Sequence, residues 1–308
     1  MILLCGLPSE EPINLVWQRL TELGARVVMW NQRRFEIMNL ELEIHRAKIE
    51  GRLHIGDQCY PLDEFSGIFL RTIAESSLPE LQELPAHHPT HRSCTELHAL
   101  LYAWCEGASG VVMNRTSAGG SNSSKPYQAL TIRKNGFLTP PTLITNNPNE
   151  VHKFMSLHKN IIYKSTSGVR SIVSMLTEKD LKRLESIRWC PTQFQAYVEG
   201  TDIRVHTVGS EIFATEIKTN GVDYRYAGCN ENGWTKLQAT NIPDDVADQC
   251  LHLADELGLT LAGIDLRRTT DGRFYCFEVN PCPGFSYYES NTGQTISMAI
   301  ARQLSGMK

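Results

Sequence analysis

The stretch GIDLRRTTDGRFYCFEVNP at residues 263–281 sets two strand-forming runs on either side of the Asp-Gly pair 271–272. Such a pair between such runs is a strong hairpin signal, because a tight turn needs residues that tolerate positive φ. If these two residues alone form the turn, counting back along both strands places Asp265 directly opposite Glu278. The sequence therefore predicts a hairpin with two facing carboxylates.

The predicted hairpin has one polar and one apolar face, because side chains alternate along a strand. Asp265, Glu278 and Asn280 share the polar face, with Arg267 beside them. The apolar residues expected on the opposite face are Ile264, Leu266, Phe277 and Val279.

The opposed acids suggest a metal site. Cross-strand like charges cost about 0.2–1 kcal/mol, so a sheet that accepts them usually has a cation to neutralise them. Asp265, Glu278 and Asn280 offer hard oxygen donors, which suit Mg²⁺, with Mn²⁺ as the alternative ion. A solvated polar sheet face without a ligand explains the hairpin equally well, so other segments must decide.

The bulk composition excludes several classes of protein. The 308 residues are 41% hydrophobic and 21% charged, with a net charge of −4, which is typical of a globular protein and gives no reason to expect nucleic-acid or membrane binding. The first residues, MILLCGL, lack a basic leader and favour a strand over a signal peptide, so we expect a cytoplasmic location. Nine scattered cysteines without a CxxC spacing favour free thiols. A homo-oligomer and a monomer both remain open.

Three regions follow along the chain. Strand and helix patterns alternate through residues 1–116, which predicts an α/β layer with a mostly parallel sheet and a small hairpin at 45–55. Residues 117–124 are expected to be a flexible linker before a helix at 125–135, and they begin a smaller central unit that extends to residue 200. Antiparallel strand pairs with helices are predicted for 201–308. The fold class is therefore α/β, with α+β character in the C-terminal part.

Two lysines are candidates for phosphate binding. Lys164 ends an apolar strand just before the small-residue loop 165–171, which contains Ser165 and Gly168. Such a loop can lie over a polyphosphate while a lysine supplies point charge. Lys125 lies in the first turn of a helix, where a cation is unfavourable unless an anion is near. Each lysine taken singly is more often solvated, and no P-loop spacing occurs.

The strand after the central unit supplies further candidates. Backbone groups of residues 196–198 could contact an adenine edge in a cleft. Asp202, Arg204 and His206 share one face of the next strand, and Arg225 follows in the sequence AspTyrArg. Arginines near an acidic metal site suit anionic oxygens that arrive between them, although ordinary surface ion pairs are the simpler interpretation of each alone.

Together these segments resemble the ATP-grasp superfamily, specifically its RimK-like branch, named for the ribosomal-protein glutamate ligase. The resemblance runs from Lys125 to the C-terminus and rests on an ordered set rather than on any single motif. The matching elements are Lys125 before Gly136, ProProThr 140–142, TyrLys 163–164 with its loop, GlnAlaTyrVal 195–198, AspIleArgValHis 202–206, AspTyrArg 223–225, GlyIleAspLeu 263–266 and GluValAsnPro 278–281.

The resemblance implies a role for each candidate residue. Lys125 and Lys164 would bind the ATP phosphates, with Ser165 and Gly168 in the covering loop. Gln195, Tyr197 and Val198 would lie at the adenine, and Asp202 at the ribose. Arg204 and Arg225 would neutralise the transferring phosphoryl and acyl-phosphate oxygens, while Asp265, Glu278 and Asn280 would bind Mg²⁺. The loop departs from the family pattern, because Gly168 is its only glycine.

The implied activity is ligation of a carboxylate to an amine through an acyl phosphate, with ATP consumed and ADP formed. The tail 280–294 is similar to the end of graspetide, or microviridin-type, ligases, so a peptide macrocyclase that forms side-chain esters or amides is the second interpretation. The aromatic residues 285, 287 and 288 of this tail are expected to pack against the last helix rather than line an acceptor pocket. A non-catalytic ATP-binding module and a phosphotransferase are further alternatives.

Overall fold

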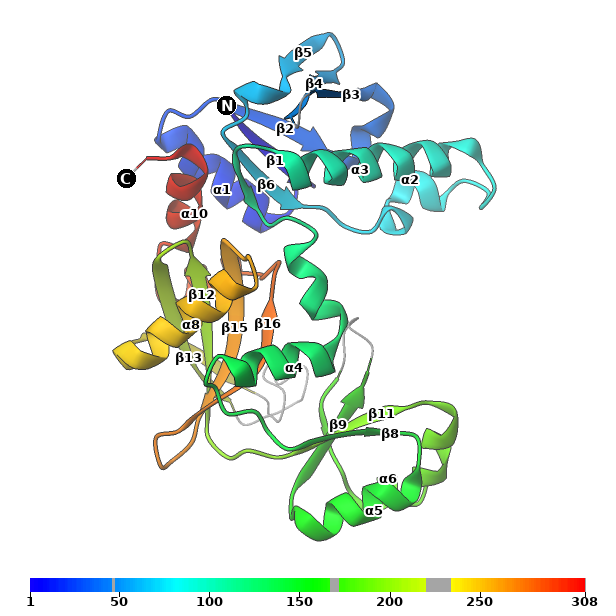
Figure 1. The fold of residues 1–308 in the computed structure, drawn as a ribbon, viewed down its shortest axis with the longest axis vertical. Helices are drawn as coiled ribbons and strands as arrows, with labels where there is room; N and C mark the ends of the chain where they lie inside the picture. The colour runs from blue at the N-terminus through cyan, green and yellow to red at the C-terminus, as the bar shows by residue number, and fades with distance from the viewer. Residues whose placement is uncertain (46–47, 167–171, 220–233, 308) are drawn as a thin grey trace.

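A computed structural model describes residues 1–45, 48–166, 172–219 and 234–307 (Figure 1). Across these ranges the strands form four sheets: a parallel sheet near the N-terminus, a small antiparallel sheet attached to it, a central antiparallel sheet and a C-terminal antiparallel sheet. The α/β fold class with an antiparallel C-terminal part is confirmed. The boundaries 1–116, 117–200 and 201–308 stay a prediction.

The N-terminal sheet is parallel, as the alternating pattern predicted, with the strand order β2-β1-β6-β7. Its strands are β1 (Ile2–Gly6), β2 (Val27–Asn31), β6 (Gly67–Arg71) and β7 (Val111–Met113). Their near-continuous apolar runs are typical of strands covered by helices on both faces.

Three helices cover this sheet, and one of them comes from the other end of the chain. They are α1 (Glu11–Glu22), α3 (Pro89–Gly107) and α10 (Ile296–Ser305). Ile13, Val16 and Leu20 of α1 share one hydrophobic cluster with Ile300 and Leu304 of α10. The last helix therefore lies beside the first, as Figure 1 shows, and completes the N-terminal core.

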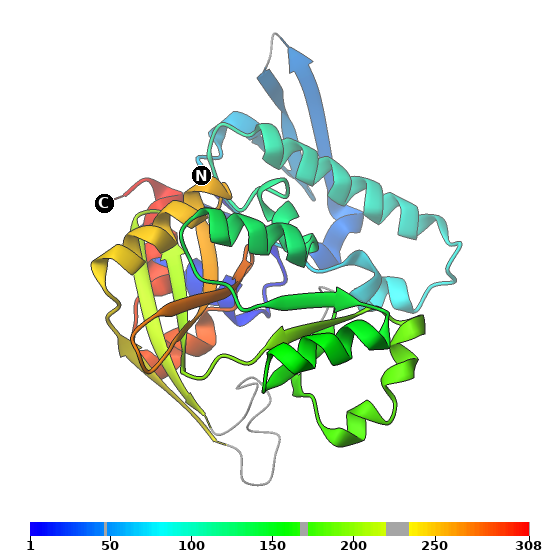
Figure 2. The same cartoon turned by 60° about the horizontal axis from the view of Figure 1, so that its bottom comes forward.

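The small attached sheet is larger than the predicted hairpin. It consists of β3 (Met38–His45), β4 (Lys48–Ile55) and β5 (Gln58–Pro61), and it projects from the layer in Figure 2. A short helix, α2 (Pro79–Gln82), precedes α3. Helix α3 begins at Pro89 because the His88 ring accepts a hydrogen bond from the Thr90 amide at 3.3 Å.

The prediction of a flexible linker at 117–124 is wrong, because Ala118–Ser123 form a 3₁₀ helix. The Glu106 carboxylate accepts hydrogen bonds from the Thr116 hydroxyl and from the amide and hydroxyl of Ser117, which fixes the start of the segment. The next helix, α4 (Lys125–Lys134), ends before Gly136 at φ +88°, as predicted. Its Ile132 packs in the core of the C-terminal sheet.

The central sheet is antiparallel in the order β10-β9-β11-β8. Its strands are β8 (Thr142–Thr145), β9 (Ile161–Ser165), β10 (Ser174–Met175) and β11 (Thr192–Ala196), with helices α5 (Pro148–Leu157) and α6 (Glu178–Leu181) on one face. Strand β8 was not expected, because four residues between Pro-Pro and Asn-Asn-Pro give too short a periodic signal.

The C-terminal sheet is antiparallel in the order β14-β13-β12-β15-β16. Its strands are β12 (Thr201–Val208), β13 (Glu211–Thr219), β14 (Thr235–Thr240), β15 (Leu261–Arg268) and β16 (Phe274–Asn280). Helix α8 (Asp244–Glu256) packs with α4 on one face, and α9 (Ser286–Thr292) precedes α10. On the other face, Asp202, Asp265 and Arg267 line a cavity shared with the central sheet, while Arg204 and His206 lie against the ring of Tyr288.

Two further findings complete the fold. None of the helices in the described ranges is both long and apolar enough to span a membrane. Each of the eight cysteines in these ranges is a free thiol, in agreement with the sequence interpretation.

Candidate functional site

The C-terminal hairpin places Asp265 opposite Glu278, as predicted, but by a different route. The turn is one residue longer than expected, because Thr269 pairs with Arg273 and Gly272 adopts φ +83°. A bulge beside Asp265 then adds Phe277 as an extra residue on β16. The longer turn shifts the pairing by one residue and the bulge shifts it back, so Asp265 still lies opposite Glu278.

The bulge also corrects the predicted apolar face. Phe277 does not lie on the core side, since it lines the same cavity as Glu278. Cys276 takes the core position instead, beside Leu266 and Val279. Because residues 277 and 278 both face the cavity, an aromatic ring lies next to the acids.

Each opposed acid has its own basic partner. Arg204 Nη1 donates to Asp265 Oδ1 at 2.7 Å, since residues 204 and 265 pair directly between β12 and β15. Lys125 at the start of α4 donates to Glu278 Oε1. The anion that Lys125 needs at a helix N-terminus is therefore Glu278. The side chain of Arg204 is only 6% exposed, whereas that of Asp265 is 37% exposed and accessible from the cavity.

The donor set fits a hard divalent cation. Within the described ranges no three His, Cys, Asp or Glu side chains gather into a metal cluster. An ion here would therefore depend on Asp265, Glu278, the Asn280 amide and oxygens of its ligand, which is the arrangement that Mg²⁺ prefers. Asn280 Oδ1 already accepts a hydrogen bond from the Cys282 amide at 2.9 Å, which fixes the orientation of its amide.

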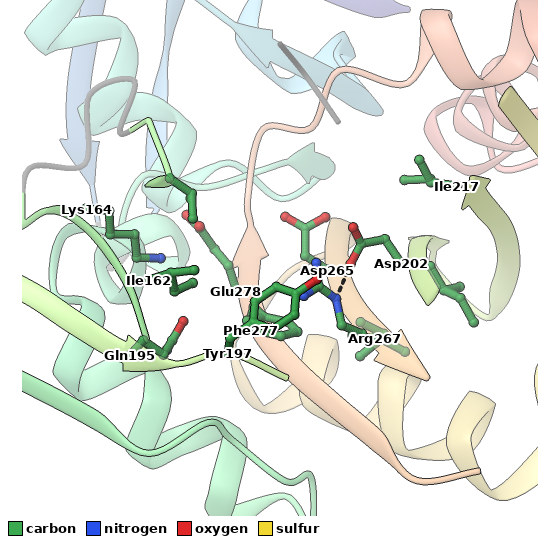
Figure 3. Close-up of a pocket in the computed structure, with 13 residues that line it drawn as sticks. Ile162, Lys164, Gln195, Tyr197, Asp202, Ile217, Asp265, Arg267, Phe277 and Glu278 are labelled. Atoms are coloured by element: carbon green, nitrogen blue, oxygen red, sulfur yellow. Dashed lines mark hydrogen bonds and ion pairs between the residues drawn. The ribbon is translucent and has the colours of Figure 1, made fainter. Parts of the chain in front are cut away.

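A cavity between the central and C-terminal sheets brings the candidates together (Figure 3). The central sheet and the segment that follows it contribute Lys164, Gln195 and Tyr197, and the C-terminal sheet contributes Asp202, Asp265 and Glu278. The remaining lining residues are Ile162, Val173, Ile203, Ile217, Leu266, Arg267 and Phe277.

The amide of Gln195 makes one hydrogen bond and leaves its oxygen available to a ligand within the described part of the chain. Its Nε2 donates to Thr142 Oγ1 at 2.9 Å, which fixes the orientation of the amide. Its Oε1 is buried and has no hydrogen-bond partner among the described residues. A buried acceptor without a partner is costly, so this oxygen suits a ligand that brings a donor into the cavity.

The other candidates lie at different distances from the cavity. Arg204 and Lys125 reach it through Asp265 and Glu278, and Val198 is connected to it through Arg267. Ser165 is exposed at the end of β9, opposite Thr192. The amides of Ala196 and Tyr197 donate to Pro141 O and Asn160 O. Gly168 and Arg225 lie outside the described residues.

Arg267 is a member of the site that sequence reasoning noted without assigning a role. Its Nε donates to Asp202 Oδ1 at 2.6 Å and its Nη1 to Val198 O at 2.9 Å. Its guanidinium lies 5.4 Å from the ring centre of Tyr197 and 5.3 Å from that of Phe277. Burial acts to lower the pKa of Arg267, but the hydrogen bond and charge of Asp202 outweigh it and raise the pKa. The pairing of β12 with β15 was not predicted from the sequence. Knowledge of this pairing would have placed Arg267 opposite Asp202.

A buried group supports Arg204 from behind. His206 is fully buried, accepts from Arg204 Nε at 3.5 Å and lies edge-on to the Tyr288 ring. Burial, followed by the charge of Arg204, holds the pKa of His206 well below its usual value, so the ring is neutral. A Cβ at Gly263 would overlap the Arg204 guanidinium, which explains the glycine before Ile264.

The aromatic residues of the tail mostly pack in the core, as expected. Phe285 and Tyr288 are buried in the cluster that includes α10, while Tyr287 is half exposed. The predicted preference for packing over an acceptor pocket is confirmed for the first two.

Comparison with known proteins gives a consistent picture. The family model of the RimK-like ATP-grasp domain matches residues 122–304. A probable alpha-L-glutamate ligase of Xylella fastidiosa is 24% identical over 182 residues, covering 56% of this chain and 60% of that protein. The first curated relatives are thus matched over 50–62% of their own length.

Solved structures match over nearly the whole chain. The ATP-grasp ligase PsnB, complexed with minimal precursor, Mg and ADP, is 25% identical with a TM-score of 0.81, covering 99% of this chain and 96% of that one. The macrocyclase MdnC from Microcystis aeruginosa, bound with precursor peptide MdnA, is 25% identical with a TM-score of 0.81, covering 98% of each chain.

Proposed function

The chain belongs to the RimK-like ATP-grasp family, and from this premise we propose that it is an ATP- and Mg²⁺-dependent ligase that joins a carboxylate to an amine and releases ADP. The observation that carries the proposal is the opposed pair Asp265 and Glu278, each neutralised by a base and both facing one cavity.

The cavity offers a place for each part of the nucleotide. The Gln195 Oε1 atom suits the exocyclic amine of adenine, and Ile162, Val173 and Phe277 suit its apolar faces. Asp202 would contact the ribose. Lys164 would bind phosphate oxygens from the central side, and Lys125 from the C-terminal side.

Asp265, Glu278 and Asn280 would hold Mg²⁺, which, when bound, offsets the charge of the phosphate oxygens. Lys125 and Arg204 now lie on the two acids, so they are placed to turn to phosphate oxygens nearby. Arg225, which lies outside the described residues, is proposed as a second arginine on the transferring group.

The proposed reaction has two steps. A carboxylate oxygen of the substrate attacks the γ-phosphorus, the bond from that phosphorus to the bridging oxygen breaks, and ADP leaves. The nitrogen of the amine then attacks the acyl carbon, phosphate departs, and the nitrogen loses a proton to give an amide. Arg204 stabilises the charge that spreads over the phosphoryl oxygens, so catalysis depends on position and electrostatics rather than on a side-chain nucleophile.

A peptide macrocyclase is the second candidate. The observation that favours it is structural similarity, because the precursor-bound ligases match 98–99% of this chain with TM-scores of 0.81, whereas a D-alanyl-alanine synthetase that covers 99% of this chain gives 0.60. In this case the acyl donor is a side-chain carboxylate of a peptide, and the acceptor is an amine or hydroxyl of the same peptide.

One assay separates the candidates. The protein is incubated with ATP, Mg²⁺ and a panel of amino-acid and peptide carboxylates, with and without hydroxylamine, and ADP and acyl hydroxamate are measured. Hydroxamate formation supports the ligase, and a dehydrated cyclic product from a peptide supports the macrocyclase. A stable phosphorylated product would identify a phosphotransferase, and ATP binding without any turnover would identify a non-catalytic module.

A further inference from the structure

Strand β16, which carries Glu278 and Asn280, lies at the edge of its sheet. One side of its backbone pairs with β15, and the groups on the other side need partners from elsewhere. Near the hairpin turn the Leu138 carbonyl accepts from the Cys276 amide at 2.8 Å. From Val279 onward, side chains of other segments bond to the backbone carbonyls instead.

The first of these side chains is Gln128 of α4. Its Nε2 donates to Val279 O at 2.8 Å, and its Oε1 accepts from Val279 N at 3.1 Å. Gln128 is 2% exposed, so both bonds lie in a dry environment where they are hard to replace with water.

Asn114, directly after β7, makes the second contact. Its Nδ2 donates to Pro281 O and to Leu261 O, both at 2.6 Å. Its Oδ1 accepts from the amides of Thr260 and Leu261 at 2.9 and 3.1 Å. One buried amide thus fixes the start of β15 to the end of β16.

Arg71 ends β6 and makes the third contact. Its Nη1 donates to Pro283 O at 2.9 Å and lies 3.4 Å from Cys282 Sγ. Its Nε donates to Glu10 Oε1 at 2.8 Å, which fixes the direction of the guanidinium. Arg71 and Asn114 thus come from adjacent strand ends of the N-terminal layer.

The three contacts hold the backbone next to the proposed metal donors. The clamped carbonyls belong to Val279, which lies between Glu278 and Asn280 in β16, and to Pro281 and Pro283 in the segment that follows the strand. Resting on the function proposed above, we propose that Gln128, Asn114 and Arg71 form a clamp of positioning residues that sets Glu278 and Asn280 for a divalent cation. The N-terminal layer therefore helps to build the metal site.

The effect should be on metal affinity, because metal ligands need their outer contacts to stay in place, and removing such contacts typically weakens metal binding by 10–100-fold. None of the three clamp residues lines the cavity, so the nucleotide base should bind as before. If the three clamp residues contributed only to folding, a variant that still folds would bind the cation and the nucleotide as tightly as the wild type.

The test measures Mn²⁺ bound to the full chain in the presence of ADP, by electron paramagnetic resonance, with ADP affinity measured separately in EDTA. We expect Arg71→Met and Gln128→Met to weaken Mn²⁺ binding by about tenfold or more, with unchanged ADP affinity. Arg71→Lys should recover part of the loss. Arg92→Gln, an exposed arginine of α3, is the matched control and should bind like the wild type.

Two outcomes would overturn the clamp, and they are distinguishable. If the wild type binds Mn²⁺ and ADP but folded Arg71→Met and Gln128→Met bind Mn²⁺ equally well, the clamp is wrong and the proposed function stands. If the wild type itself binds no Mn²⁺ in the presence of ADP, the proposed metal site fails and the clamp fails with it. Should a methionine variant not fold, Arg71→Lys and Gln128→Glu, which keeps only the acceptor for Val279 N, decide in its place.

Discussion

The two walls of the cavity differ in how their polar groups are used. Each of the three described acids that line the cavity from the C-terminal sheet has a base beside it: Asp202 with Arg267, Asp265 with Arg204, and Glu278 with Lys125. Among the described residues that line the cavity, the central wall carries Lys164, the Gln195 amide, whose Oε1 has no hydrogen-bond partner in that part of the chain, Tyr197 and apolar side chains. The first wall is organised for charge and the second for a flat, mostly apolar group. Substitutions on the two walls should therefore change different kinetic constants.

The strongest break is expected from Glu278→Gln, which removes one acid of the charged wall and keeps its shape. Turnover should fall by about a thousandfold or more, because both the proposed metal site and the partner of Lys125 lose their charge. The measurement is ADP release under saturating substrate, alongside the thermal unfolding midpoint. If the folded variant turns over like the wild type, Glu278 is not a metal ligand.

The substitution Gly263→Ala should disturb the same wall indirectly, through the ion pair of Arg204 with Asp265. A Cβ there would overlap the Arg204 guanidinium and push it away from Asp265, so kcat should fall by about a hundredfold. Gly120→Ala is the matched control, because a Cβ at Gly120 has open space around it and should leave kcat unchanged. Equal activity of both variants would show that the position of Arg204 does not matter.

On the central wall, Gln195→Leu should weaken ATP binding and leave the chemical step nearly intact. The loss of one buried acceptor predicts a roughly tenfold rise in KM for ATP, with kcat changed by less than about twofold. Thr142→Val, which removes the contact that orients the Gln195 amide, should give the same change at smaller size. A fall in kcat instead of a rise in KM would place Gln195 among the reacting groups.

The smallest effect is on the stability of the folded protein at low pH, through His206 behind Arg204. Burial and Arg204 hold the pKa of His206 well below 6.5, so the unfolded chain binds a proton that the folded chain does not. Stability should therefore fall as the pH drops below about 6.5, by up to about 1.4 kcal/mol per pH unit from this residue. Unfolding midpoints measured from pH 7.5 to 5.5 should depend less steeply on pH for His206→Gln than for the wild type, with His252→Gln, at an exposed histidine of α8, as the comparison variant.

Local patterns in the sequence carried much of the fold and part of the site. The parallel layer, the end of α4 at Gly136 and the pairing of Asp265 with Glu278 all follow from short-range signals. The pairing succeeded although the turn was misjudged, because the bulge at Phe277 cannot be read from alternation. Short strands such as β8 were missed for lack of a periodic pattern.

Long-range contacts could not be predicted in the same way. The ion pairs of Arg204 with Asp265 and of Arg267 with Asp202 join residues 61 and 65 positions apart, and they form because β12 lies beside β15. The contacts of Gln128 with Val279 and of Asn114 with Pro281 join residues 151 and 167 positions apart. These contacts depend on the order of the strands in the sheet, and a single sequence does not reveal that order.

The place of α10 beside α1 has a consequence for biosynthesis. The face of the N-terminal sheet that Ile2 and Leu4 line shares its hydrophobic cluster with residues 296–304, so part of this face has no cover while the chain is being translated. This side of the layer cannot close over Ile2 and Leu4 until residues 296–304 have been synthesised. A chain truncated before residue 296 lacks the α10 side chains of this cluster, so we expect it to unfold at a lower temperature than the full chain.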